Sequence, residues 1–278
     1  MLINLNGSLI DLSTPIVMGI LNITPDSFFE GSRCQTADKI CYRAEEITRQ
    51  GGKIIDVGGY STRPGAKEVT ADEELDRVVF AMKTIREKFP EVPVSIDTFR
   101  ANIAQIAVRD FGAAIVNDIS GGTLDEQMFE TVADLKVPYI LMHIKGNPQT
   151  MQQNTNYVDF IPEIFLYFAE KVNKLKQLGV NDIILDPGFG FAKTLELNYE
   201  LLAKMNLFSQ FELPVLAGVS RKRMIWQLLD TTPDESLNGT TAVNMLALAQ
   251  GANILRVHDV KEAVEVVRIF EKFKEFKR

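Results

Sequence analysis

The residues best suited to chemistry stand in a basic turn near position 220. The apolar run 214–217 predicts a buried strand that Gly218 ends, and Ser220 could cap a helix over 224–229. The cations at 221–223 would then lie in the first turn of that helix, where each is disfavoured by roughly 0.3–1 kcal/mol. Either this is a solvated surface turn, or an anion or electron-rich ligand lies opposite it.

A polar residue also closes almost every other apolar run in the chain. One polar strand end is routine loop chemistry, but carboxylates, amides and cations at the ends of nearly all the predicted strands indicate a site. The residues at these ends are Asn22, Asp56, Asp97, Asn117, Asp118, His143, Asp186, Lys222, Arg256 and His258.

Eight apolar runs would position these residues, and amphipathic helical patterns separate most of them. The runs are 16–21, 53–57, 93–97, 113–117, 138–142, 182–186, 214–217 and 253–257. This alternation predicts an α/β fold, a single (β/α)8 TIM barrel domain over residues 1–278, whose strand ends share one rim. A doubly wound open sheet is the alternative. An Asn6-Gly7 turn predicts a hairpin over 2–12 that closes the bottom of the barrel.

Composition excludes several classes of protein. The net charge of −7 and a pI near 5.1 disfavour general nucleic-acid binding. Two cysteines, Cys34 and Cys41, exclude a disulfide scaffold and fit a reducing cytoplasm. The start of the chain lacks the pattern of a signal peptide, and no apolar run approaches the 18 or so residues that a membrane span needs.

The predicted rim has two chemical halves. One half suits a flat heterocycle with several N–H groups and a carbonyl, and it comprises Asp97, Asn117, Asp186 and Lys222. The other half suits phosphate oxygens, and it comprises Asn22, Thr62, Arg63, Arg256 and His258. The amide oxygen of Asn22 could in addition hold a hard cation.

Some of these residues also have purely structural explanations. Asp56 is expected to brace a loop or a backbone N–H rather than react, and His143 to orient a strand end. His258 is a stronger candidate because Arg256 precedes it by two residues and so shares its strand face. The sequence offers no His/Cys cluster for zinc and no convincing Ser-His-Asp order.

Eight different short motifs lie at or beside these strand ends. They are GILNITPDSF at 19–28, DVGGYSTRPG at 56–65, SIDT at 95–98, VNDISG at 116–121, MH at 142–143, DPGFGF at 186–191, GVSRK at 218–222 and RVH at 256–258. Through them the chain, from about Ile16 to Asp259, resembles the dihydropteroate synthase family of the folate pathway. Two departures stand out: Tyr60 where the family often has Glu, and Phe29-Glu30 where it often has Ser-Asp.

The resemblance implies a reaction. The family condenses 6-hydroxymethyl-7,8-dihydropterin pyrophosphate with p-aminobenzoate to give 7,8-dihydropteroate and pyrophosphate, by Mg2+-assisted dissociative substitution. It implies a cytoplasmic enzyme, usually a homodimer and a target of sulfonamides, with small-molecule substrates and neither nucleic-acid nor membrane partners.

The resemblance also implies roles for individual residues. The implied pterin site comprises Asp97, Asn117, Met142, Asp186, Gly218 and Lys222. The implied pyrophosphate site comprises Asn22, which also holds Mg2+, with Thr62, Arg63, Arg256 and His258. The implied p-aminobenzoate pocket comprises Phe28, Pro64, Phe191 and Ser220. The residues implied in catalysis are Asp97, Lys222, Arg256, His258 and Arg63.

Two alternatives remain at this point. A pterin-binding methyltransferase that acts on a corrinoid protein would share Asp97, Asn117 and Asp186, but it should not need the segments 61–64 and 220–222. A non-catalytic pterin-binding relative would be expected to lose the residues of the pyrophosphate half, all of which are present.

Overall fold

The computed structural model describes residues 1–24, 36–61 and 68–276. Within them an eight-stranded parallel sheet has the order β8-β7-β6-β5-β4-β3-β10-β9. Its strands are β3 (Ile16–Asn22), β4 (Ile54–Gly58), β5 (Val94–Asp97), β6 (Ile115–Asp118), β7 (Tyr139–Met142), β8 (Ile183–Asp186), β9 (Leu216–Ala217) and β10 (Ile254–Val257).

The sheet closes on itself between β8 and β9. A parallel bridge joins Leu185 to Val215, and the backbone N–H of Leu185 donates to the carbonyl of Pro214 at 2.8 Å. Contact between the two ends of a parallel sheet is what distinguishes a barrel from a doubly wound sheet. The predicted (β/α)8 barrel is therefore confirmed, and the open sheet is excluded.

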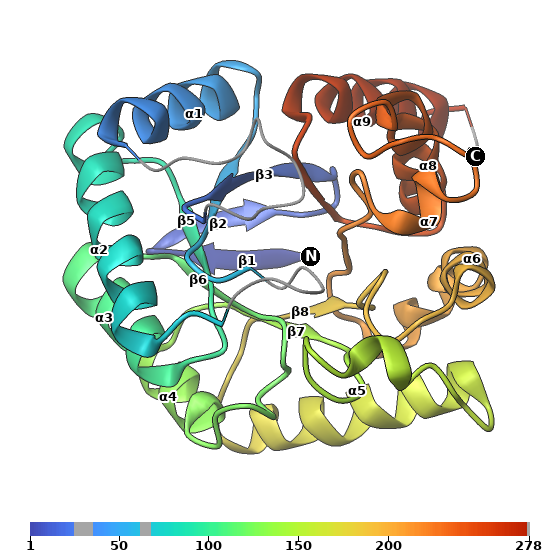
Figure 1. Ribbon diagram of the computed structural model, residues 1–278, viewed down its shortest axis with the longest axis horizontal. Helices are drawn as coiled ribbons and strands as arrows, with labels where there is room; N and C mark the ends of the chain where they lie inside the picture. Colours follow the sequence, from blue (N-terminus) through green and yellow to red (C-terminus); the bar gives the residue numbers. More distant parts are fainter. Residues whose placement is uncertain (25–35, 62–67, 277–278) are drawn as a thin grey trace.

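Helices surround the barrel strands as an outer ring (Figure 1). They are α1 (Ala37–Arg49), α2 (Ala71–Lys88), α3 (Ala101–Phe111), α4 (Met128–Leu135), α5 (Phe160–Gln177), α6 (Leu195–Ala203), α7 (Arg223–Trp226), α8 (Leu237–Ala249) and α9 (Val260–Lys274). Short 3-10 helices, η2 (Met151–Gln153) and η3 (Met205–Phe211), lie in the connections.

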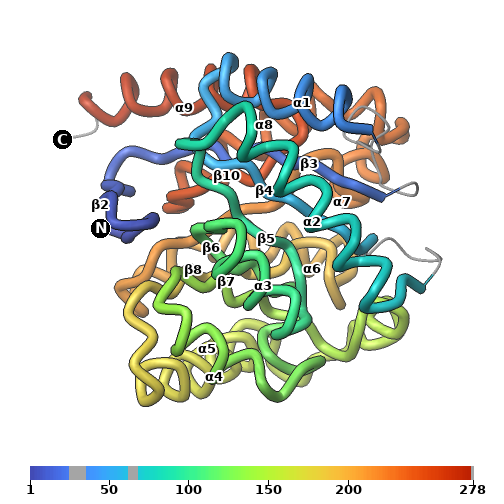
Figure 2. Tube along the Cα trace, turned by 90° about the vertical axis from the view of Figure 1, so that its left-hand side faces the viewer, coloured from blue at the N-terminus to red at the C-terminus, as the bar shows by residue number. Residues whose placement is uncertain are grey.

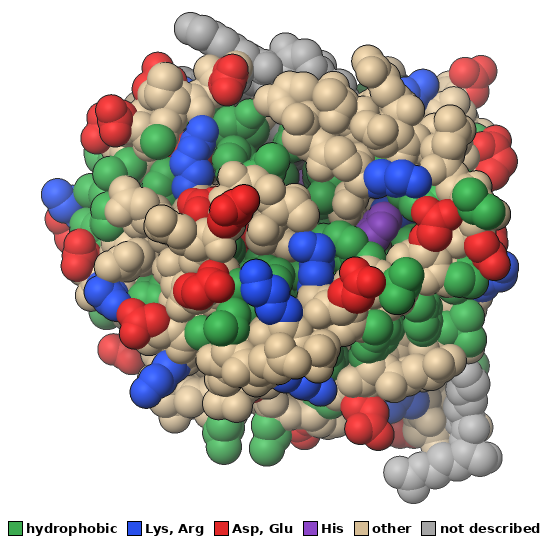
Figure 3. Space-filling model, turned by 90° about the horizontal axis from the view of Figure 1, so that it is seen from below, with side chains coloured by type: hydrophobic (Ala, Val, Ile, Leu, Met, Phe, Trp, Pro, Cys, Tyr) green, Lys and Arg blue, Asp and Glu red, His purple; other side chains and the backbone are tan. Residues whose placement is uncertain are grey.

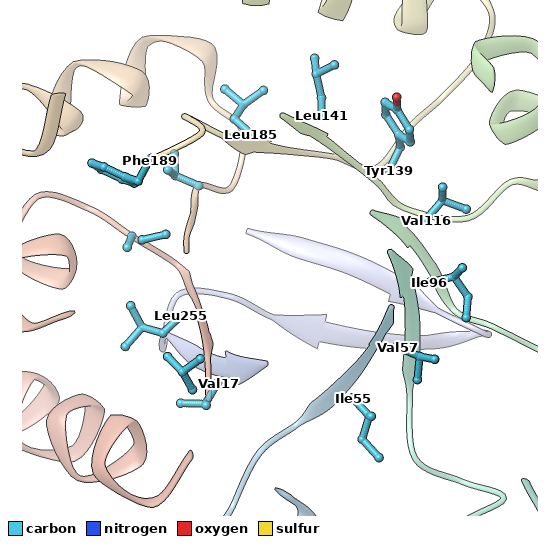
Figure 4. Packing of buried hydrophobic residues seen from close by; sticks show 14 of the residues in the cluster. Val17, Ile55, Val57, Ile96, Val116, Tyr139, Leu141, Leu185, Phe189 and Leu255 are labelled. Atoms are coloured by element: carbon cyan, nitrogen blue, oxygen red, sulfur yellow. The ribbon is translucent and has the colours of Figure 1, made fainter. Parts of the chain in front are cut away.

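Apolar side chains from alternate strand positions bind the ring of helices to the barrel. Figure 4 shows Val57, Ile96, Val116, Leu141 and Leu255 pointing away from the barrel axis, and all five are fully buried. Each such side chain contributes roughly 1.5–3 kcal/mol relative to its exposed state. This shell of contacts holds the strand ends, and therefore the rim residues, at fixed positions.

The N-terminal hairpin closes the opposite end of the barrel from the rim, as predicted (Figure 2). Strands β1 (Leu2–Leu5) and β2 (Ser8–Asp11) pair antiparallel. The turn between them is Asn6-Gly7, and both turn residues have a positive φ. Ile3, Leu5 and Leu12 are buried against residues at the amino ends of the strands. The apolar plug keeps water out of this end of the barrel, so polar chemistry is confined to the carboxyl ends.

Local helix signals are confirmed at some positions and wrong at others. Thr36 caps α1, and Thr70 with Glu73 forms the predicted capping box of α2. The expected helix over 224–229 is instead the four-residue α7, which starts after Lys222 and receives no side-chain cap. The helices α4 and α6 complete the alternation where the sequence analysis placed no helix.

Candidate active site

Polar residues stand at the carboxyl ends of neighbouring strands. In the sheet register, Asp97 stands beside Asn117 on one neighbouring strand and Gly58 on the other, while Met142 stands beside Asp186. The parallel strands therefore deliver these side chains side by side at the carboxyl end of the barrel, as the sequence predicted.

Arg256 is the centre of the first cluster. Its Nε donates to Oδ2 of Asp56 at 2.6 Å, and its Nη2 donates to Oδ2 of Asp97 at 2.5 Å. Asn117 donates from Nδ2 to both oxygens of Asp56 at 3.3 Å. Asp56 is fully buried, and its carboxylate accepts from the side chains of Asn117 and Arg256 rather than from the loop or backbone N–H that the sequence analysis expected. Asp56 thereby orients Asn117 and Arg256 toward the interior of the rim.

Burial sets the protonation of this cluster. It raises the pKa of Asp97 to about 7, because Arg256 offsets only part of the cost of burial and the carboxylates Asp56, Asp118 and Asp186 add to it. For Arg256 itself, burial acts to lower the pKa, but Asp56 and Asp97 outweigh burial and raise it, so the guanidinium stays charged. Asp97 is thus a carboxyl group poised to change its charge near neutral pH.

The second cluster joins Asp186 and Lys222. Burial raises the pKa of Asp186, and the charge of Lys222 is the largest opposing influence. Burial likewise lowers the pKa of Lys222 to about 8, opposed by Asp186. Lys222 also donates to the carbonyl of Phe189, and its Nζ lies 4.7 Å from the centroid of the Phe191 ring. Each ionised group of this pair favours the charged state of the other.

Ser220 and His258 form a third group. The backbone N–H of His258 donates to Oγ of Ser220 at 3.2 Å, and the same Oγ lies 3.0 Å from Nδ1 of His258. The hydroxyl hydrogen can therefore be donated to Nδ1, which leaves the ring proton on Nε2. Burial and the nearby cations Arg256, Arg43 and Arg221 hold the pKa of His258 well below its usual range, so the ring is a neutral donor.

The expected arrangement of cations at a helix start is wrong. Arg221 is buried with a left-handed φ of 53°, and its guanidinium binds both oxygens of Asp259 at 2.8 and 2.9 Å. Arg223 is exposed and donates to Gln227. Lys222 donates to the carbonyl of Phe189 in the loop after β8, and Ser220 does not cap α7. The backbone reversal at Arg221 sends the three side chains in different directions.

The other predicted residues are distributed as follows. Gly218 and Met142 lie buried in the barrel near Lys222 and Asp186, and Phe191 is partly exposed beside Lys222. Thr62, Arg63, Pro64, Phe28 and the departure Phe29-Glu30 lie outside the described residues. The other departure, Tyr60, stacks edge-on against Phe99 and accepts a hydrogen bond from Gln149 at 3.1 Å.

Asn22 is the residue to test for a metal. A Cβ built on Gly58 would lie 3.4 Å from Oδ1 of Asn22 and 3.7 Å from Oδ2 of Asp97, so both oxygens flank this glycine on the rim. Mg2+ commonly takes one or two protein oxygens and completes its shell with phosphate and water. No group of three or more His, Cys, Asp or Glu residues in the described ranges could hold a metal. Asn22 could therefore supply one oxygen of such a shell, and phosphate and water would have to supply most of the rest.

Two buried cations that contact residues of the rim were not predicted from the sequence. Arg43 of α1 is buried and donates to the carbonyls of Ile20 and His258. Its spacing from Ile40 and Ala44, on the apolar face of the predicted helix, was an available signal. Lys193 is buried beside His143. It follows the DPGFGF motif in a loop, where no hydrophobic periodicity could reveal it.

On the face shown in Figure 3, acidic and basic side chains are interspersed rather than gathered by sign. None of the helices described is long and apolar enough to cross a membrane.

Comparisons with known proteins agree with this geometry. The pattern of the pterin binding enzyme family matches residues 18–258. Dihydropteroate synthase of Escherichia coli K12 is 46% identical over 268 residues, 95% of this chain and 94% of the relative. The Bacillus subtilis enzyme of the same name is 42% identical over 258 residues, 92% of this chain and 87% of the relative.

Solved structures give the same result. The Yersinia pestis dihydropteroate synthase in complex with a sulfonamide drug superposes with a TM-score of 0.94 at 40% identity, covering 100% of both chains. The Thermus thermophilus enzyme in complex with 4-aminobenzoate gives a TM-score of 0.86 at 32% identity, covering 98% of this chain and 99% of that one. The chain therefore belongs to the dihydropteroate synthase family of pterin binding enzymes.

Proposed function

We propose that this chain is a transferase that joins 6-hydroxymethyl-7,8-dihydropterin pyrophosphate to p-aminobenzoate and releases pyrophosphate. The observation that carries the proposal is the convergence of Asp97, Asn117, Asp186 and Lys222 on one rim, from β5, β6, β8 and the turn after β9. Acceptors and donors of this kind match the N–H edge and the carbonyl of a pterin ring. The family names above support the same activity.

The pterin half would bind and orient the first substrate. Asp186, whose ionised form Lys222 favours, can when ionised accept two hydrogen bonds from adjacent ring N–H groups. Asn117, held by Asp56, can both donate and accept at the ring edge. Met142, buried beside Asp186, would provide apolar contact with the ring. Asp97, when ionised, would place negative charge beside the methylene carbon as it becomes cationic.

The bond between the methylene carbon and the pyrophosphate oxygen would break first. The electron pair leaves with pyrophosphate, whose growing charge Arg256 and the Nε2–H of His258 can stabilise, with Arg63 and Thr62 as further expected donors. Asn22 would hold Mg2+, which would supply further neutralisation of that charge. The arylamine nitrogen of p-aminobenzoate then attacks the carbon and loses a proton, so the new C–N bond replaces the broken C–O bond.

The p-aminobenzoate position rests on residues at the edge of the rim. Phe191 offers an aromatic wall, and Lys222 lies over its ring. The Thermus thermophilus relative was solved in complex with 4-aminobenzoate, which supports a pocket for this substrate in the same fold. Ser220 remains a predicted contributor, together with Phe28 and Pro64. A homodimer in the cytoplasm and a single functional domain remain predictions.

One assay separates this proposal from its alternatives. Purified protein with Mg2+ is incubated with the pterin pyrophosphate and p-aminobenzoate, and dihydropteroate and pyrophosphate are quantified together. The proposal expects equal amounts of both products. A corrinoid methyltransferase or a non-catalytic pterin-binding protein would bind the pterin and form neither, and that outcome would exclude the proposed activity.

A further inference from the structure

Lys193 is a buried cation that the proposed mechanism does not use. Only 4% of its surface is exposed, and it lies between the loops that follow β7 and β8. Its Nζ lies 3.0 Å from Nδ1 of His143 and donates to the carbonyls of Gly188 and Phe191, both at 2.9 Å. An ammonium group has three hydrogens, so these three acceptors satisfy it completely.

Two of these acceptors belong to the turn after β8, which carries two predicted substrate contacts. Asp186 accepts from the N–H of Gly188 at 2.8 Å at the start of the turn, and Phe191 stands at its end. Gly188 has a φ of 71°, and a Cβ there would lie 2.1 Å from the carbonyl oxygen of His143. Lys193 donates to the carbonyls of Gly188 and Phe191, while Lys222 donates to the carbonyl of Phe189 between them. The turn is thus held between two ammonium groups.

The third acceptor, His143, is itself held on the other side. Its ring packs edge-on against Tyr167 with centroids 4.8 Å apart, and the hydroxyl of Tyr167 donates to the carbonyl of Met142 at 2.7 Å. Burial and the charges of Lys193 and Lys145 hold the pKa of His143 well below its usual range. The imidazole is therefore neutral, and Nδ1 can accept from Lys193.

We propose that Lys193 is a positioning residue for the condensation: its ammonium group ties His143, at the end of β7, to the turn after β8, and so fixes the pterin-binding Asp186 and the aromatic wall Phe191 as one rigid unit. The inference rests on the proposed function, because it assigns a purpose to the spacing between the two substrate positions. Lys193 touches neither substrate in this account and acts through Asp186 and Phe191.

The charges of Lys193 and Asp186 also support a link between Lys193 and the pterin-binding residues. The cations that lower the pKa of Asp186 against burial are Lys222, Arg256 and Lys193. Burial lowers the pKa of Lys193 to about 7, Asp186 opposes that change, and Lys222 adds to it. Asp97 faces the same space and is sensitive to the charge of Asp186. An ionised Asp186 therefore helps to keep Lys193 protonated, and a protonated Lys193 helps to keep Asp186 ionised.

The test compares Lys193→Met with Lys171→Met and Lys193→Arg. Lys171 also donates to a loop carbonyl, that of Gly121 at 2.6 Å, but not to the turn after β8. In Lys193→Met we expect KM for both substrates to rise about tenfold or more, as for the loss of a charged hydrogen bond. The acid limb of kcat/KM for the pterin should move to higher pH because Asp186 loses a cation. Lys193→Arg should restore the limb, and Lys171→Met should leave both readouts unchanged.

Several outcomes would overturn the assignment. If Lys193→Met folds and only its stability changes, Lys193 is merely structural. If that variant does not fold, nitrogen NMR of the unmodified protein decides, because the chain has only two histidines to assign. A neutral His143 with its proton on Nε2 supports the contact, whereas a proton on Nδ1 excludes it. Absence of turnover in the unmodified protein would instead refute the proposed function.

Discussion

Arg256 is the residue on which the charge balance of the rim depends. It binds Asp56 and Asp97 at once, at 2.6 and 2.5 Å, and among the residues that the structure describes it is the only cation that forms an ion pair with either carboxylate. The guanidinium of Arg256 therefore balances the charge of Asp97, a predicted pterin contact, and is also the proposed partner of the leaving group. Removing it would leave the fully buried Asp56 and the largely buried Asp97 without their main counter-charge.

We predict that Arg256→Met shifts the pH dependence of pterin binding. The pKa of Asp97, raised from 3.8 to about 7, should rise further when its cation is lost. Calorimetry with hydroxymethyl dihydropterin should therefore show that the acid limb of the pH profile of pterin affinity lies at higher pH than in the unmodified protein. Arg109→Met, which breaks an exposed pair with Asp134, should leave the limb in place. An undisplaced limb in Arg256→Met would mean that Asp97 does not govern pterin affinity.

At the scale of single residues, the sequence predicted which residues lie at the rim better than it predicted which side chains they contact. The strand ends Asp97, Asn117 and Asp186 were found because parallel strands place their last residues at one edge. The pairing of Arg256 with Asp56 joins residues 200 positions apart, and periodicity along the chain contains no information about it. Lys193 was missed for the same reason, since its importance comes from burial against His143.

The segment after β9 is the element whose geometry matters most. It reverses direction at Arg221, which takes a left-handed φ of 53°, so that Lys222 enters the barrel while Arg221 turns toward Asp259. Arg221 also donates to the carbonyls of Pro233 and Asp234 at 2.7 Å. These bonds anchor the turn that presents Ser220 and Lys222 to the site.

We predict that Arg221→Met and Arg223→Met differ sharply in stability although the residues are neighbours of one turn. Loss of the buried Arg221 should lower the free energy of unfolding by about 3–5 kcal/mol, because Asp259 is left without its partner. Loss of the exposed Arg223 should change it by less than about 0.5 kcal/mol. Urea unfolding measures both variants, and similar losses would show that Arg221 is not an anchor.

Element prediction succeeded where hydrophobic patterns are long. The capped helices α1 and α2 carry apolar positions over 13 and 18 residues, enough to define a face. The helices α4 and α6 have eight and nine residues, so a period of 3.6 repeats only about twice in each. The four-residue α7 depends on the backbone reversal at Arg221, which no propensity for a basic residue predicts.

In the whole molecule, one end of the barrel is apolar and the other end is polar. The apolar plug formed by Ile3, Leu5 and Leu12 covers the amino ends of the strands, and the titratable groups gather at the carboxyl ends. The alternation of strands and helices was sufficient to predict the barrel. Its closure was not certain from sequence, because β9 has two residues and joins β8 through one bridge at Leu185 and Val215.

We predict that the plug contributes to stability and not to chemistry. Ile3 is 1% exposed, so Ile3→Ala should lower the free energy of unfolding by about 2–5 kcal/mol. Leu9 of the same hairpin is 67% exposed, and Leu9→Ala should have little effect. Denaturant unfolding together with kcat at a permissive temperature tests this. A large fall in kcat for folded Ile3→Ala would show that the two ends are coupled.

The most direct test of the location of the pterin site at the carboxyl rim compares substitutions of two aspartates at opposite ends of one strand, β8. Asp186 ends β8 at the rim, while Asp182 precedes the same strand at the opposite end and accepts from the N–H of Asn4 in the hairpin. We compare Asp186→Asn and Asp182→Asn by calorimetry with hydroxymethyl dihydropterin.

In Asp186→Asn, an amide donor would face a ring donor, and each charged hydrogen bond lost costs about 1.5–3 kcal/mol. The account predicts that Asp186→Asn weakens pterin binding by about tenfold or more in a protein that remains folded, while Asp182→Asn binds as the unmodified protein does. Unchanged affinity in Asp186→Asn, or an equal loss in both variants, would contradict it.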